Sequence, residues 1–105
     1  MDEKTTFGKA IANARKDKKL HQNELAKLIK REDGEPISPQ YLNDIEHDRR
    51  SPSSDVIRQL ATKLDLAPDY LHVLVGKWPA DLPTHTLTEK DVTSLMTAFR
   101  RKVDR

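Results

Sequence analysis

Apolar residues recur at intervals of three and four along the first two thirds of the chain, which is the spacing of one helix face. The pattern predicts five helices: about residues 6–18, 22 to 31 or beyond, 38–47, 55–64 and 68–75. Asp33-Gly34 is a turn signal after the second helix, and Gly76 ends the fifth. No segment shows the alternation of a strand. We therefore expect an all-α domain over residues 5–76.

The segment 38–47 carries the clearest local signals. Ser38 is a good N-cap, because its hydroxyl accepts hydrogen bonds from amides of the first turn, and Pro39 loses no hydrogen bond at the first helical position. The apolar residues Leu42 and Ile45 share one face. The other faces carry Gln40, Tyr41, Asn43 and Asp44. Since Gln and Asn amides pair with adenine in the major groove, this helix points to DNA.

A different pattern follows residue 76. Residues 77–87 contain Pro79 and Pro83 and no periodicity, which predicts a linker. Residues 88–105 are predicted as an amphipathic helix capped by Thr88. Its apolar face consists of Val92, Leu95, Met96, Phe99 and Val103. This face either packs on the chain's own domain or makes a dimer contact, because it would be a costly exposed patch on a monomer.

The net charge of +2 does not by itself indicate a nucleic-acid binder, but its distribution is uneven. Residues 1–31 carry a balance of +5, residues 32–48 carry −6 and residues 49–105 carry +3. One interpretation is a solvated mixture of charges. The other is that helix-end lysines and the Arg49–Arg50 pair frame a site for phosphates.

Several classes of protein fit poorly. The chain has no cysteine, which excludes disulfides and thiolate metal sites. The histidines at 21, 47, 72 and 85 lack ligand spacing, and no glycine-rich phosphate loop is present, so we expect no metal, no cofactor and no enzymatic activity. There is no apolar run of membrane-spanning length, and Met1 opens a charged segment rather than a signal peptide. The expected location is the cytoplasm, at the nucleoid.

In this order the residues resemble the Cro/repressor-type helix-turn-helix regulators, the XRE family, over about residues 5–76. The motifs that carry the resemblance are Gln-x-x-Leu-Ala at 22–26, Tyr41-Leu42-x-x-Ile45-Glu46, Arg49-Arg50 and Pro52. The resemblance implies a five-helix lambda-repressor-like domain, with the C-terminal amphipathic helix added to it. It also implies that helix 38–47 lies in the major groove of double-stranded DNA.

The resemblance also assigns roles to single residues. Gln22 contacts phosphate and braces helix 38–47, and Asn23 stands beside it at a helix N-terminus, where amides bind phosphate. Arg15 and Glu46 form a structural ion pair. The remaining DNA contacts fall on Ser38, Pro39, Gln40, Tyr41, Asn43, Asp44, Arg49 and Arg50. Asp44 either accepts from cytosine N4 or forms an intramolecular pair, and we favour the pair.

Three departures from the family pattern stand out. The connection from Lys27 to Ile37 is about six residues longer than is typical, so the second helix extends or residues 32–35 project as a loop. His21 replaces the common Ser or Thr cap. Asp48 replaces the glycine that usually ends the third helix, and Asp adopts the left-handed conformation less readily than Gly.

These observations favour a sequence-specific regulator, a repressor that binds a palindromic operator as a homodimer. The alternative is an antitoxin-like protein-interaction module on the same fold, which neutralises a protein partner through the last helix and binds DNA only to regulate itself or not at all. The acidic stretch 32–48 keeps this alternative open.

Overall fold

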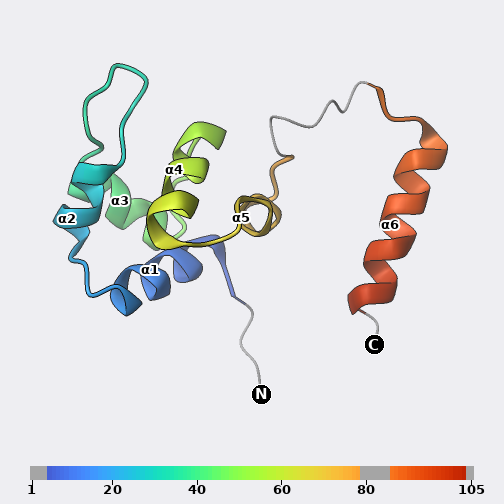
Figure 1. The fold of residues 1–105 in the computed structure, drawn as a ribbon, viewed down its shortest axis with the longest axis horizontal. Helices are drawn as coiled ribbons and strands as arrows, with labels where there is room; N and C mark the ends of the chain where they lie inside the picture. Colours follow the sequence, from blue (N-terminus) through green and yellow to red (C-terminus); the bar gives the residue numbers. More distant parts are fainter. Residues whose placement is uncertain (1–4, 79–85, 104–105) are drawn as a thin grey trace.

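The computed structural model describes residues 5–78 and 86–103, which form six helices (Figure 1). They are α1 (Phe7–Asp17), α2 (Gln22–Leu28), α3 (Pro39–Glu46), α4 (Ser54–Leu64), α5 (Pro68–Val75) and α6 (Glu89–Val103). The described residues contain no strand beyond one isolated bridge between Lys30 and Pro36. The predicted all-α class is therefore confirmed. Pro79, Pro83 and His85 of the predicted linker lie outside the described residues, as do Met1 and residues 104–105 of the last helix.

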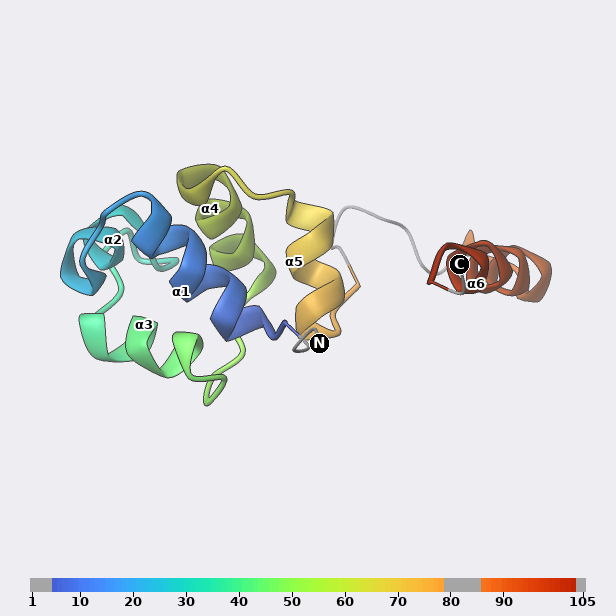
Figure 2. The ribbon, with the colours of Figure 1, turned by 90° about the horizontal axis from the view of Figure 1, so that it is seen from below.

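The first five helices enclose one apolar core. α1 lies between α3 and α4, and α5 packs against α4 and α1 (Figure 2). The largest fully buried apolar side chains are Ile11, Leu25, Ile29, Leu42, Ile45, Ile57, Leu60 and Leu71. Each of the five helices contributes at least one of these side chains, so the core holds α2 and α3 in place from the inside.

Short polar side chains cap the starts of α1 and α4. The hydroxyl of Thr6 accepts from the Lys9 amide at 3.1 Å, and that of Ser53 accepts from the Val56 amide at 3.2 Å. α4 therefore begins one residue before Asp55. Gly76 ends α5 at a φ of 77°, a left-handed conformation that favours glycine.

The prediction that the second helix reaches Arg31 is wrong. α2 ends at Leu28, and Ile29 is extended, with φ −107° and ψ 124°. The amide of Ile37 donates to the Ile29 carbonyl at 2.9 Å, so the chain leaves and returns at the same place. Both isoleucines are buried, which closes the base of a projecting loop over residues 30–36 (Figure 1). The extra residues thus form a loop rather than more helix.

α6 stands apart from the other five helices (Figures 1 and 2). None of its side chains is buried, so its apolar face does not pack on the five-helix part in this structure. Of the two alternatives weighed for this face, folding back onto the domain is not observed. No helix among the described residues combines the length and the apolar character that crossing a membrane requires.

Candidate nucleic-acid interface

α3 presents a polar outer surface on an apolar foundation. Leu42 and Ile45 are completely buried. Ser38 caps the helix, since its hydroxyl accepts from the Tyr41 amide at 3.0 Å. The predicted DNA contacts of α3 and its cap lie at the surface: Ser38, Pro39 and Gln40 are exposed, and Tyr41, Asn43 and Asp44 are partly exposed. The geometry therefore presents these side chains outward on one well-anchored element.

An ion pair inside the domain holds the last turn of α3. Arg15 Nε donates to Glu46 Oε2 at 2.7 Å, and Arg15 Nη2 donates to Glu46 Oε1 at 3.0 Å. The Glu46 side chain is only 2% exposed. The remaining donor, Arg15 Nη1, reaches the Leu20 carbonyl at 2.8 Å. This two-pronged geometry fixes both the position and the rotation of α3 relative to α1.

Gln22 connects the start of α2 to the same carboxylate. Its Nε2 donates to Glu46 Oε1 at 2.9 Å and to Asn43 Oδ1 at 3.1 Å. The brace expected of Gln22 is therefore in place, while Asn23 beside it is exposed in the first turn of α2. The amide of His21, which stands in place of the usual cap, donates to the Glu24 carboxylate at 2.7 Å. These contacts join the two helices of the motif at their polar side.

Asp48 links the end of α3 to the beginning of α1. It adopts φ 60°, the left-handed conformation in which glycine is more usual. Its Oδ1 accepts from the Gly8 amide at 2.8 Å, and its Oδ2 accepts from the Thr6 hydroxyl at 2.6 Å. The aspartate thus accepts from one N–H of the first turn of α1 and from the hydroxyl of its N-cap, and it also ends α3. Sequence reasoning missed these roles of Thr6 and Gly8.

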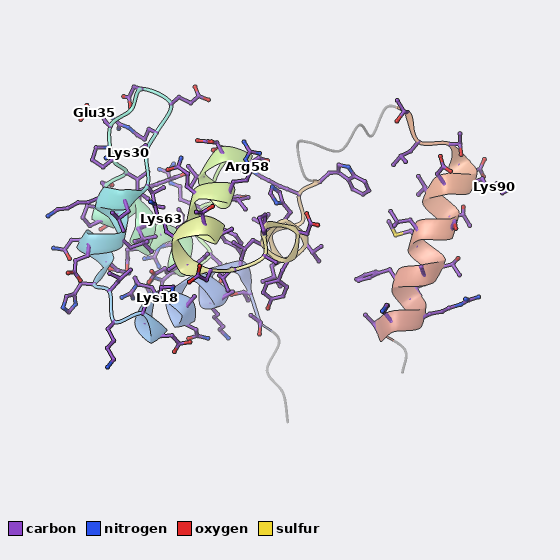
Figure 3. The ribbon with its side chains drawn as sticks, viewed as in Figure 1. Lys18, Lys30, Glu35, Arg58, Lys63 and Lys90 are labelled. Carbon is purple, nitrogen blue, oxygen red and sulfur yellow. The ribbon has the colours of Figure 1, made fainter. Side chains whose placement is uncertain are left out.

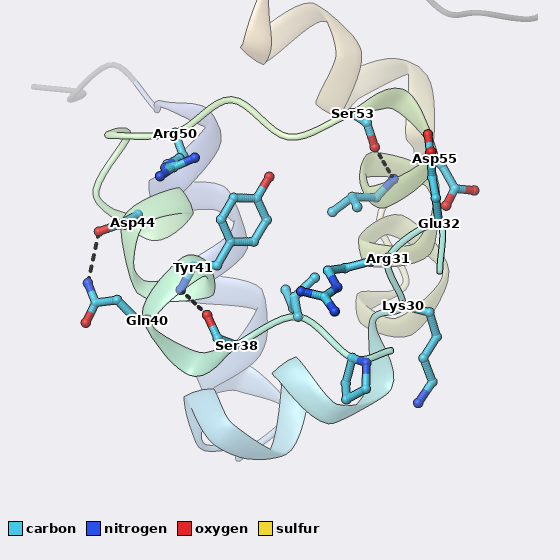
Figure 4. Close-up of a pocket in the computed structure, with 13 residues that line it drawn as sticks. Lys30, Arg31, Glu32, Ser38, Gln40, Tyr41, Asp44, Arg50, Ser53 and Asp55 are labelled. Carbon is cyan, nitrogen blue, oxygen red and sulfur yellow. Dashed lines mark hydrogen bonds between the residues drawn. The ribbon is translucent and has the colours of Figure 1, made fainter. Parts of the chain in front are cut away.

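Asp44 forms the intramolecular contacts that we favoured from the sequence. Its Oδ1 accepts from Gln40 Nε2 at 3.1 Å (Figure 4). The same oxygen lies 3.3 Å from Arg49 Nε. The carboxylate therefore ties down one side chain expected to read a base and one expected to contact phosphate. Both side chains are thereby held against the surface at α3.

A cavity of about 520 Å³ opens beside α3, between the 30–36 loop and the start of α4 (Figure 4). At the edge of the cavity the Arg50 guanidinium lies over the Tyr41 ring. Its distance of 5.7 Å from the ring centre is that of a cation–π contact. The charged side chains that line the cavity are balanced: Lys30, Arg31 and Arg50 against Glu32, Asp44 and Asp55. The long loop and the two expected DNA contacts Tyr41 and Arg50 therefore line the same cavity.

Gln59 of α4 anchors the loop. The Lys30 amide donates to Gln59 Oε1 at 2.7 Å, and Gln59 Nε2 donates to the Lys30 carbonyl at 2.8 Å. At the tip, the Glu35 amide and the Arg31 guanidinium both bind the Asp33 carboxylate and hold the pKa of Asp33 below its ordinary value. The loop is therefore an ordered projection, with Lys30 at its base and Glu35 near its tip (Figure 3). Nothing in the local sequence indicated Gln59.

Two of the described histidines contact backbone carbonyls of the preceding helical turn. His47 Nδ1 lies 2.8 Å from the Asn43 carbonyl, and His72 Nδ1 lies 2.9 Å from the Pro68 carbonyl. Over residues 5–78 and 86–103, no three histidine, cysteine or acidic side chains converge on a point that could hold a metal ion.

Comparison with known proteins identifies the arrangement. A helix-turn-helix family model matches residues 11–71, which is more than half of the chain. The crystal structure of the P22 c2 repressor protein in complex with synthetic operator 9T in the presence of Tl+ superposes with a TM-score of 0.56 at 26% sequence identity, covering 65% of this chain and 94% of that one. A search of curated sequences finds no match. The chain belongs to the Cro/repressor-type helix-turn-helix family of DNA-binding regulators.

Proposed function

We propose that this protein is a sequence-specific repressor that binds a palindromic operator as a homodimer, with α3 in the major groove of double-stranded DNA. Residues 5–76 form the DNA-binding domain, residues 77–87 the linker and residues 88–105 a separate helix. The protein acts in the cytoplasm, at the nucleoid. The P22 c2 repressor, which is similar to 65% of this chain, is in complex with a synthetic operator in its crystal structure.

The observation that carries the proposal is the attachment of α3 at both ends. Ser38 caps its start, and Arg15, Gln22 and Asp48 hold its end through hydrogen bonds of 2.6–3.1 Å. Base readout requires side chains that are presented from a rigid element, because a displacement of an ångström breaks bidentate hydrogen bonds. The attachment of α3 at both ends supports DNA readout by its exposed side chains.

The other predicted contacts divide by chemistry. Gln40 and Asn43 supply amides for base edges, and the α2 start with Gln22 and Asn23 offers N–H groups to phosphate. Arg49 and Arg50 follow α3, where a guanidinium neutralises the strand across the groove. Tyr41 extends this surface toward the cavity. Phosphate contacts hold the domain in register, and the amides on α3 supply the sequence preference.

Selection of bound sequences from random duplex DNA tests the proposal. The full chain should enrich a two-fold symmetric motif whose half-sites lie about one helical turn apart. The matched variant is Gln40→Ala, which removes one reading amide and leaves the Gln22–Asn43 hydrogen bond, Arg49 and Arg50 in place; it should lose the base preference at one position of each half-site and keep binding to unrelated DNA. Failure of the full chain to enrich any motif would contradict sequence-specific regulation.

One observation favours the second candidate, an antitoxin-like interaction module. The loop beside α3 is acidic at its tip, where Glu32, Asp33 and Glu35 are all exposed. Such a projection repels phosphates and suits a basic protein partner. An enriched symmetric motif would reduce this candidate to an additional role, whereas no motif together with a stable complex with a basic partner would establish it.

A further inference from the structure

α6 carries an apolar face that nothing in the described chain covers. Its members Val92, Leu95, Phe99 and Val103 are 40%, 46%, 54% and 68% exposed. We propose that this face pairs with α6 of a second copy of the chain, and that the two helices run antiparallel. The pairing is a property of the free protein, and only its use at an operator rests on the proposed function.

The distribution of charge along α6 favours the antiparallel orientation. Its first turn holds Glu89, Lys90 and Asp91, a balance of −1, and its last turn holds Arg100, Arg101 and Lys102. A parallel pair would bring like charges together at both ends, whereas an antiparallel pair places each acidic end beside a basic end. The helix dipoles also favour the antiparallel arrangement. The helix therefore complements itself only when one copy is reversed.

The spacing of the apolar residues defines the register. Val92, Met96, Phe99 and Val103 are separated by four, three and four residues, so the order of intervals is the same in both directions. In an antiparallel pair Val92 lies level with Val103 of the partner subunit, and Met96 lies level with the partner's Phe99. Each contact then occurs twice about a two-fold axis near residues 97–98, the symmetry that a closed dimer requires. Leu95 flanks this seam and widens it.

The five-helix domain offers less for the same face. The exposed large apolar side chains of this part are Leu28 on α2, Tyr70 and Val73 on α5, and Trp78 just after α5. The seam of α6 extends over residues 92–103, about three helical turns. A second copy of α6 in the reversed direction has the same length and covers this whole seam, whereas the exposed apolar side chains of the five-helix part come from three different segments.

Disulfide cross-linking of full-length protein without DNA tests the orientation. The chain has no cysteine, so Val92→Cys and Val103→Cys introduce single thiols. The antiparallel register predicts that a mixture of the two variants cross-links readily while neither variant alone does. In an antiparallel pair two copies of residue 92 would lie about 16 Å apart along the axis, beyond the reach of a disulfide. Self-linking of each variant would overturn the orientation.

Sedimentation equilibrium tests the pairing itself. Phe99→Asp should raise the dimer dissociation constant at least tenfold, while Thr97→Asp, which adds the same charge outside the seam, should change it little. Equal dissociation constants for the two variants would overturn the proposal. So would a loss of thermal stability of the five-helix domain in Phe99→Asp alone, because that would mean that α6 packs on its own domain. A failure of the selection experiment would leave these results unchanged, so the two proposals fail separately.

Discussion

Gly8 and Glu46 lie so close that no side chain fits between them. A Cβ on Gly8 would be 2.4 Å from the Glu46 carbonyl oxygen and 2.6 Å from that of Ile45. The start of α1 is therefore in backbone contact with the end of α3. The amide of Gly8 also donates to Asp48, so one glycine serves both the approach and the hydrogen bond.

Gly8→Ala should destabilise the domain by about 1–3 kcal/mol, because the methyl group meets backbone atoms that cannot rotate away. Urea unfolding followed by circular dichroism measures the change. Asn13→Ala, at an exposed position of the same helix, is the control and should stay within about 0.5 kcal/mol of the parent. Equal stability of the two variants would contradict the close approach.

Arg15→Met should lower the free energy of unfolding by about 3 kcal/mol, because it leaves the buried Glu46 carboxylate without its ion partner. The double variant Arg15→Met/Glu46→Leu should recover much of the loss, since it removes the buried charge as well. Arg58→Met breaks the exposed pair with Asp55 and should cost less than about 1 kcal/mol. A double variant as unstable as Arg15→Met would show that the charge is not the cause.

Gln40→Ala should weaken binding to the selected operator by about 1–3 kcal/mol and change binding to unrelated duplex little. The reason is that a side chain reading a base edge contributes only where that base is present. Fluorescence anisotropy on both duplexes gives the comparison. The same loss on both would make Gln40 a phosphate contact instead.

Asp44→Asn should strengthen binding to unrelated duplex by about twofold to fivefold, because it removes a negative charge that pairs with Arg49 at the surface. The substitution keeps the shape of the side chain. If the carboxylate instead accepts from cytosine N4 in the complex, the variant should bind the operator more weakly. The sign of the change thus separates the two roles considered for this residue.

Arg49→Ala should weaken binding to all duplexes and reduce the slope of log affinity against log salt by about 0.9 for each copy that loses a phosphate contact. Lys63→Ala is the matched control, since it removes one positive charge on α4, which lies on the other side of α1 from α3 (Figures 2 and 3). Titrations at several salt concentrations supply the slope. An unchanged slope for Arg49→Ala would exclude a phosphate contact there.

The helices were predictable wherever the signals are local. Ser38 and Pro39 indicate the start of α3. The three-residue spacing of Leu42 and Ile45 predicts that both face the core, where they are buried. The end of α2 was not predictable in this way, because Ile29 continues the apolar face by periodicity. The helix ends there because the Ile29 carbonyl accepts from the amide of Ile37, eight residues away. The helical repeat of apolar residues carries no information on that contact.

The missing parts of the candidate site have the same origin. Thr6 and Gly8 contact Asp48 across 42 and 40 residues, and Gln59 contacts Lys30 across 29. Each is an ordinary polar or small residue in its own neighbourhood, and only the packing of α1 on α3 and of the loop on α4 gives it a role. Arg15 and Glu46 are 31 residues apart along the chain, and the family resemblance alone suggested that they meet.

Because the base of the 30–36 loop is closed, the position of α3 does not depend on the number of residues in the loop. Because Ile29 and Ile37 are joined to each other and to the core, residues between them can change in number without moving either helix. No atom lies within 4 Å of the position that a Cβ on Gly34 would take, so the tip has room for an inserted peptide or a reporter group. Such a graft would sit beside the candidate DNA-binding surface and report on its occupancy from a fixed point.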